Sequence, residues 1–247
     1  MILLLDAGNT AIKWGVYRDG LLARTGGFRH RDEDFPSVAA AAWHDVQRPA
    51  RVVVANVGGQ RLGRQISEYT AARWAMAPEF VRTTAAAGGV INAYADPARL
   101  GVDRWAALIG ARQHCRAPVC VIDCGSAITV DLLDTGGRHR GGVILPGIEM
   151  LQTVLLENTA NIRMTDPVTE ISPLARDTGS AVTSGAVYMA VAALGRVVAD
   201  MAAATEVEPA VVVAGGDAVR ILPLLNLSAR HDPDLVLKGL AVLSGDT

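Results

Sequence analysis

Two stretches of this sequence share one pattern: an apolar strand ends in Asp, followed by a small residue, a Gly, a hydroxyl or amide residue, and a second strand. The first occupies residues 3–14, with Asp6 ending its strand, and the second occupies residues 120–131, with Asp123 in that place. A carboxylate there suits Mg²⁺, which prefers oxygen ligands, and a Gly turn lets a phosphate approach backbone N–H groups. The repeat predicts two halves that face one phosphate-bearing ligand and its metal ion.

A purely structural interpretation competes with this hypothesis. A tight hairpin needs Gly, and Asp6 and Asn9 are ordinary turn formers. The second stretch favours a function, because Asp123 ends an otherwise apolar strand, where a carboxylate is costly unless it is paired or bound to a cation. The chain contains no GxxxxGK[ST] loop, and its Gly clusters lack the strand-to-helix spacing of a dinucleotide-binding fingerprint.

A third group of polar residues surrounds the start of a predicted helix: Tyr94 comes shortly before it, and Asp103 and Arg104 are adjacent within it. Asp103 could simply favour the helix dipole, and Arg104 could form a surface ion pair. Alternatively, Asp103 accepts the proton of a substrate hydroxyl while Arg104 holds a carboxylate or phosphate. Both interpretations stay open on local grounds.

Composition limits the classes of function. The chain has 247 residues, half of them apolar, and a net charge of -2. Its Arg residues are scattered, so nucleic-acid binding is not favoured. The five His residues lack metal-ligand spacing, and Cys120 and Cys124 are expected to be buried structural thiols, as in a reducing cytosol. Asp6 interrupts the apolar start, and no stretch is expected to span a bilayer, so we expect a soluble intracellular protein.

Strands and helices alternate along the chain, which predicts an α/β protein with a largely parallel sheet. Each half is expected to begin with three strands and to continue with helices and a further strand, so the pattern indicates a duplication with a boundary near residue 116. A long apolar helix is predicted from Thr178, either deeply buried or packed against another subunit. Other predicted helices cover residues 35–47, 59–74, 97–115, 146–156 and 235–243, with Pro146 as a helix start.

Four motifs, in order, resemble those of the type III pantothenate kinases, which belong to the acetate and sugar kinase/Hsp70/actin superfamily. Residues 6–10 resemble a DxGN(T/S) motif, residues 101–104 a GxDR motif, residues 123–127 a DxGTA motif and residues 141–147 a GGxIxPG motif. The resemblance implies an α/β fold of duplicated actin-like (ribonuclease H-like) domains, each a mixed sheet with flanking helices. These would be residues 1–116 and residues 117–247, the latter with a dimerisation helix.

The resemblance also implies a function: transfer of the γ-phosphoryl group of ATP to the primary hydroxyl of pantothenate, the first step of coenzyme A biosynthesis, in the cytoplasm. Asp103 would be the general base, Asp6 would organise Mg²⁺-ATP, and Asp123 would hold K⁺ or NH₄⁺. The implied enzyme is a homodimer with shared active sites, in which Thr178 reaches the neighbouring subunit's pantothenate. The implied pantothenate-binding residues are Tyr94, Gly101, Val102, Asp103, Arg104 and Thr178, and the implied ATP-binding residues are Asp6, Ala7, Gly8, Asn9, Thr10, Ala11, Ile12, Lys13 and Ser126.

Ser126 stands where the family usually has Thr, and it keeps the hydroxyl. Two alternatives are a non-catalytic transcriptional accessory factor on the same scaffold and a superfamily kinase for another small hydroxylated substrate. The chain retains the charged residues of these motifs, Asp6, Asp103, Arg104 and Asp123, which argues against a protein that has lost catalytic activity. The net charge argues against direct DNA contact.

Overall fold

The computed structural model describes residues 1–164, 168 and 170–245. The chain divides into two compact units: the first comprises Met1–Arg116, Thr135–His139 and Asp234–Thr247, and the second comprises Ala117–Asp134 and Arg140–Pro233. The sequence-based division at residue 116 keeps everything after it in the C-terminal half. The structure instead packs two later segments, a short loop and the last helix, into the first unit.

The sheet of the first unit is mixed. Its order is β3-β2-β1-β4-β5; β1 pairs antiparallel with β2 and parallel with β4, β2 pairs antiparallel with β3, and β4 pairs parallel with β5. The predicted meander of three strands at the start of the chain is confirmed, whereas a largely parallel sheet is wrong because that meander is antiparallel. The strands are β1 (Ile2–Ala7), β2 (Ala11–Arg18), β3 (Leu21–Arg29), β4 (Arg51–Asn56) and β5 (Glu79–Phe80).

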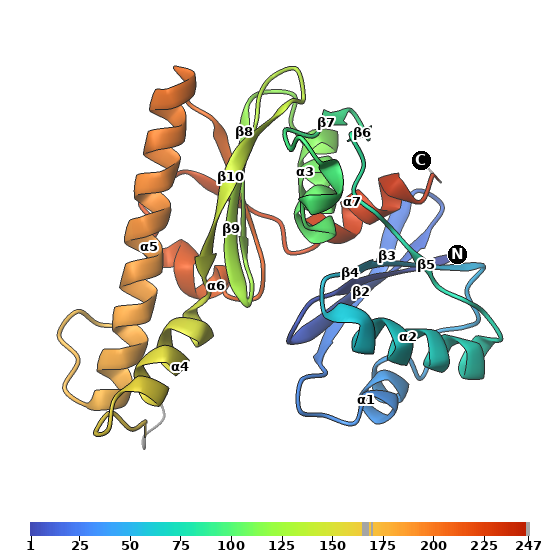
Figure 1. The fold of residues 1–247 in the computed structure, drawn as a ribbon, viewed down its shortest axis with the longest axis horizontal. Helices are drawn as coiled ribbons and strands as arrows, with labels where there is room; N and C mark the ends of the chain where they lie inside the picture. Colours follow the sequence, from blue (N-terminus) through green and yellow to red (C-terminus); the bar gives the residue numbers. More distant parts are fainter. Residues whose placement is uncertain (165–167, 169, 246–247) are drawn as a thin grey trace. The chain divides into compact units, whose positions relative to one another are not determined.

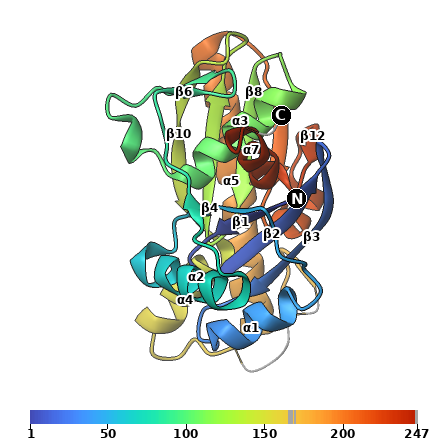
Figure 2. The same ribbon diagram turned by 90° about the vertical axis from the view of Figure 1, so that its right-hand side faces the viewer.

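Two helices, α1 (Phe35–Ala42) and α2 (Gly59–Trp74), cover one face of this sheet, and Figure 2 shows them side by side. On α2, the buried positions Leu62, Ile66 and Trp74 follow helical spacing, and they pack in one core with alternate residues of β1 and β4. The prediction for residues 59–74 is confirmed. The helix at residues 35–47 ends five residues earlier than predicted, since Trp43 is already its C-cap.

The other face is covered by α3 (Val102–His114) and α7 (Leu235–Leu243) (Figure 1). These two helices meet backbone to backbone. A Cβ on Gly239 would lie 1.8 Å from the carbonyl oxygen of Ala106, and one on Gly110 would lie 2.2 Å from that of Leu235. This close crossing explains why the last helix packs in the first unit although it follows the second unit in sequence. The remaining short elements of this unit are β6 (Ala86–Ala87), β7 (Val90–Ile91) and η1 (Pro97–Arg99).

The second unit repeats the sheet order, as β10-β9-β8-β11-β12, with β8 antiparallel to β9 and parallel to β11. The predicted duplication of architecture is therefore present. Pro146 was expected to start a helix, but it ends β10, and α4 begins only after Gly147, whose N–H donates to the Ser126 carbonyl at 3.2 Å. The elements are β8 (Val119–Cys124), β9 (Ala127–Leu133), β10 (His139–Pro146), α4 (Ile148–Asn158), α5 (Thr178–Thr205), β11 (Ala210–Ala214), α6 (Ala218–Ile221), η2 (Leu222–Leu224) and β12 (Ala229–His231).

The long helix α5 begins at a side-chain cap, where Asp177 accepts a hydrogen bond of 2.8 Å from the Ser180 N–H. One face of α5, including Val187 and Leu194, packs into the core of the second unit. By length and composition alone, α5 could cross a membrane, so the expectation that no stretch is long enough was too strict. This is weak evidence for a membrane span, because a core helix passes the same test, and 44% of its most apolar window is buried.

The crossing of α3 and α7 predicts a large difference between two Gly-to-Ala changes. Gly239→Ala should destabilise the protein by about 1–3 kcal/mol or more, since its Cβ would overlap a backbone carbonyl. Gly195→Ala, in the interior of α5, should stabilise by roughly 0.5–1 kcal/mol, because no described atom lies within 4 Å of the added Cβ. Urea unfolding followed by circular dichroism measures both changes. Equal effects would contradict the described packing.

Candidate active site

The first Asp-x-Gly turn joins β1 to β2. Asp6 is half-buried and lies opposite Lys13 in the strand pair. The Gly8 N–H donates to the Ala11 carbonyl at 3.1 Å, so Asn9 and Thr10 form the tip of the turn. Asn9 is exposed and the Thr10 side chain is buried. The turn therefore presents a carboxylate, an amide and a lysine at the carboxyl end of β1.

Neighbouring residues hold this turn, and the sequence analysis missed them. The His30 Nε2–H donates to the Gly8 carbonyl at 2.9 Å, and the Val57 and Gly58 N–H groups both donate to the Ala7 carbonyl, at 3.0 and 3.1 Å. Gly58 also caps α2, and a Cβ on it would lie 2.7 Å from the Gly8 oxygen. The positive end of the α2 dipole thus lies beside the turn, which favours an anion there. The sequence signal was available in the glycine pair that follows the buried strand β4.

The second turn joins β8 to β9 and is one residue shorter at its tip. Asp123 is half-buried and lies opposite Thr129, and the Gly125 N–H donates to the Ala127 carbonyl at 3.1 Å. Ser126 is thus the only tip residue, and it is exposed. The two turns share a backbone pattern but present different side chains.

Glycines enclose this second turn. A Cβ on Gly147 would lie 2.5 Å from the carbonyl oxygens of both Gly125 and Ser126, and one on Gly215 would lie 2.3 Å from that of Cys124. Gly215 also has a left-handed φ of 93°, which only glycine adopts readily. Gly147 and Gly215 therefore have a structural role in this unit, since they let the neighbouring backbone pack against the turn.

The cysteines beside Asp123 are structural. Cys120 and Cys124 are buried thiols in β8. Burial first, and the nearby Asp131 charge second, together raise the pKa of the Cys120 thiol to about 12. A thiol of this kind is protonated at neutral pH and is neither a nucleophile nor a metal ligand. Among the residues that the structure describes, no group of three or more His, Cys, Asp or Glu side chains could hold a metal ion.

Asp103 and Arg104 lie in the first turn of α3, which begins after its N-cap Gly101. The Asp103 Oδ1 accepts a hydrogen bond of 2.8 Å from the Arg104 N–H. A Cβ on residue 101 would lie only 2.6 Å from the same oxygen, so Gly101 makes room for the carboxylate. The helix start therefore fixes the direction of the Asp103 side chain, as a general base requires.

Arg104 is not at the surface, as the structural interpretation supposed, because it is only 7% exposed. Its Nη1 donates to the Tyr94 hydroxyl at 3.1 Å, and its guanidinium lies 5.9 Å from the centre of the Tyr94 ring. The Tyr94 N–H in turn donates to the Asn92 Oδ1 at 2.9 Å. The first unit therefore brings Asp103, Arg104 and Tyr94 together. Thr178 lies at the exposed start of α5 in the second unit.

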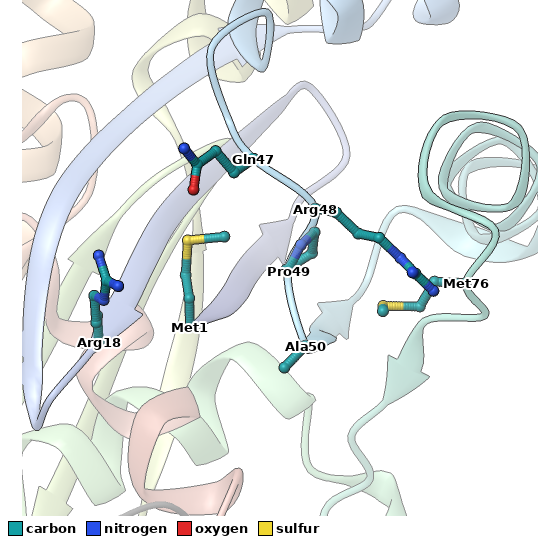
Figure 3. Close-up of a pocket in the computed structure, with 7 residues that line it drawn as sticks. All are labelled: Met1, Arg18, Gln47, Arg48, Pro49, Ala50 and Met76. Carbon is teal, nitrogen blue, oxygen red and sulfur yellow. The ribbon is translucent and has the colours of Figure 1, made fainter.

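A separate cavity of about 470 Å³ lies at the opposite end of the first sheet from Asp6 (Figure 3). Asp6 stands near the carboxyl end of β1, whereas this cavity adjoins the amino ends of β1 and β4, roughly 17 Å away along the strand. The Arg18 and Arg48 side chains lie on opposite sides of it rather than converging. It is therefore no part of the site described above. Its lining residues are Met1, Arg18, Gln47, Arg48, Pro49, Ala50 and Met76.

Two solved structures share the fold of this chain. The fold resembles that of a glucokinase from an Antarctic psychrotroph, with a TM-score of 0.50 and 14% identity over 100% of this chain and 99% of that one. It also resembles a structure named for the Baf family of transcriptional activators, from Campylobacter jejuni, with a TM-score of 0.60 and 17% identity over 99% and 100%. At these identities the likeness shows the fold alone.

The sequence comparisons are more specific. A family model described as type III pantothenate kinase matches residues 2–200. A type III pantothenate kinase of Nitrosococcus oceani is 42% identical over 252 residues, which cover 100% of this chain and 95% of the relative. The chain belongs to the type III pantothenate kinase family. It is therefore an ATP-using kinase.

The burial of the β8 thiols predicts selective labelling. At pH 8, iodoacetamide should modify Cys115, which is partly exposed, well before Cys120 and Cys124. At that pH the Cys120 thiolate is scarce because the pKa of this thiol is raised to about 12. Peptide mass spectrometry after timed labelling measures the three rates. All three should react together in denaturant, and equal rates in the native protein would contradict the structural assignment.

Proposed function

We propose that this chain transfers the γ-phosphoryl group of ATP to the primary hydroxyl of pantothenate, forming 4′-phosphopantothenate and ADP, the first step of coenzyme A biosynthesis. The observation that carries the proposal is the fixed Asp103 carboxylate beside the buried Arg104 and its half-buried partner Tyr94, in a member of this family. The hydroxyl oxygen attacks the γ-phosphorus, the bond to the β-phosphate oxygen breaks, and Asp103 accepts the hydroxyl proton.

The pantothenate-binding residues follow from this chemistry. Pantothenate carries one carboxylate, which the Arg104 guanidinium would bind. Binding there would orient the molecule so that its primary hydroxyl, at the other end, lies near Asp103 and the γ-phosphate. Tyr94, Gly101 and Val102 would line the pocket. Thr178 would contact the pantothenate of the neighbouring subunit, as the family resemblance implies.

The first turn would bind the phosphates of Mg²⁺-ATP. Asp6 would hold Mg²⁺ through water, which fits a site with one carboxylate, because Mg²⁺ keeps several waters and takes other ligands from the phosphates. Mg²⁺ supplies charge neutralisation for the transferred group. The buried Ala7 and Ile12 would contribute backbone and shape rather than polar side chains. The ATP-binding set would be Asp6, Ala7, Gly8, Asn9, Thr10, Ala11, Ile12 and Lys13, with Ser126 from the second turn and a K⁺ or NH₄⁺ ion at Asp123.

Asp103→Asn should fold normally and lose turnover by roughly 10²–10⁴-fold, the usual effect of losing a general base. Asp96→Asn is the matched control. Asp96 caps η1 through a bond of 3.1 Å from the Ala98 N–H, and Asn caps equally well. A coupled assay of ADP release with pantothenate measures both variants.

The same assay separates the alternatives. The wild-type chain should turn over with pantothenate and not with acetate or simple sugars. Turnover with a sugar alone would favour another kinase of the superfamily, and no turnover with any acceptor would favour the non-catalytic accessory factor. Full activity of Asp103→Asn would remove that residue from the role of base.

Activity should require K⁺ or NH₄⁺, because a monovalent cation at Asp123 would offset a carboxylate held close to the ATP phosphates. Replacing K⁺ with Na⁺ should lower the rate by about tenfold or more, equivalent to roughly 1.4 kcal/mol of transition-state stabilisation. Steady-state rates in matched chloride buffers measure the effect, and Asp123→Asn should remove most of the difference between the salts. Equal rates of the wild type in both salts would contradict this role.

We further propose a cytoplasmic homodimer that pairs through α4 and α5. Apolar side chains that ordinary surfaces rarely gather are exposed on these two adjacent helices, and the Gln152 Nε2 on α4 donates to the Thr183 Oγ1 on α5 at 2.7 Å. A second copy would cover them and would explain why an apolar helix is only partly buried. The exposed side chains are Met150 (48%), Val154 (54%), Leu155 (41%), Tyr188 (38%) and Met189 (59%).

Met189→Glu should convert the dimer to a monomer, because it would bury a charge in the interface. Leu21→Glu is the matched control, since Leu21 is 71% exposed on β3 of the other unit. Sedimentation velocity at micromolar protein measures the masses. A monomeric wild type would contradict the proposal, and so would binding of the wild type to neutral lipid vesicles, which would instead identify the apolar face of α5 as a membrane contact.

A further inference from the structure

His139 makes a contact that the function proposed above does not use. It is the first residue of β10, it packs in the first unit, and it is only 3% exposed. Its ring stacks on that of Tyr94, with the centroids 6.1 Å apart and the planes 15° apart. This is the offset, nearly parallel arrangement that aromatic pairs favour.

Tyr94 needs such support because of where it lies. It stands between β7 and η1, outside any helix or strand, and its own N–H is held by the Asn92 side chain. Its hydroxyl accepts the bond from Arg104, and the guanidinium lies beside its ring. The Tyr94 ring therefore contributes to the position of the Arg104 guanidinium.

His139 is well placed to fix that ring. The loop that precedes it is tied to the segment carrying Tyr94: the Ile91 N–H donates to the Gly137 carbonyl at 2.9 Å, and Ile91 forms a β-bridge with Arg138. A Cβ on Gly137 would lie 2.2 Å from the Gly89 carbonyl oxygen, so the two backbones press together. The segments that lead into Tyr94 and into His139 are thus tied to each other.

We propose that His139 is a positioning residue for the acceptor site: by stacking on Tyr94 it holds the Arg104 guanidinium where the pantothenate carboxylate binds. This inference rests on the proposed function, and it assigns His139 no contact with substrate and no proton. Loss of the stacked ring should weaken pantothenate binding and leave the ATP turn of the first unit unaffected.

Three substitutions test the stacking. His139→Ala should raise the KM for pantothenate by about two- to tenfold, the range expected for a lost aromatic pair, with the KM for ATP unchanged. His139→Phe keeps an aromatic ring of similar size and should restore the KM for pantothenate. His139→Gln keeps hydrogen-bonding groups without a ring and should behave like His139→Ala. His44→Ala, at an exposed His just after α1, is the matched control and should match the wild type.

If His139→Ala lowers the melting temperature, a double-mutant cycle still distinguishes an effect through Tyr94 from a general loss of stability. If His139 acts through Tyr94, adding His139→Ala to Tyr94→Ala should raise the KM for pantothenate no further. All rates are measured well below each variant's melting temperature, which circular dichroism provides.

The proposal is overturned if His139→Ala leaves the KM for pantothenate unchanged or raises both KM values alike. It is also overturned if Gln rather than Phe restores the KM, or if the two substitutions are additive. A wild-type chain that does not phosphorylate pantothenate would instead refute the proposed function. The activity of the wild type is therefore measured before any variant is made.

Discussion

Close backbone contact at the Asp-x-Gly turns is the constraint on which both units depend. In the first unit, Gly58 brings the start of α2 against Gly8, and in the second, Gly147 and Gly215 bring two further segments against the turn at Gly125. A side chain at any of these glycines would push the neighbouring backbone away. Because these glycines carry no side chains, the N–H groups of the turn and the N-terminal end of α2 are accessible to an anion. One packing requirement thus shapes both the sheets and the candidate phosphate site.

Local periodicity predicted much of the fold. The bounds of α2 and α7 follow from their apolar spacing, and the repeated strand–turn–strand motif indicated the repeated sheet order. Features that depend on distant partners could not be predicted. Pro146 ends a strand because the Gly147 N–H donates to the Ser126 carbonyl in the second turn, and α7 packs in the first unit because Gly239 contacts Ala106, which is distant in sequence.

The candidate site shows the same division. Residue types and order identified Asp103 and Arg104, but local arguments could not separate an ion pair on the surface from a functional pair. Burial decides the question for Arg104, since its guanidinium is enclosed beside Tyr94, ten residues away in sequence. His30 and His139 were set aside because neither has metal-ligand spacing. Their contacts, with the Gly8 carbonyl and the Tyr94 ring, involve a backbone group and a π-face, which spacing alone does not reveal.

The two turns have diverged in the one position that matters for charge. Asp6 lies across from Lys13, whereas Asp123 lies across from Thr129. An ammonium group beside the first carboxylate adds positive charge where the proposed phosphates bind. A hydroxyl beside the second adds no charge of its own, and the proposed monovalent cation would supply positive charge there if that turn is also to lie near phosphates. The divergence therefore supports different proposed roles for the two copies, with Mg²⁺-ATP at the first and a monovalent ion at the second, while the shared backbone keeps both turns in the same form.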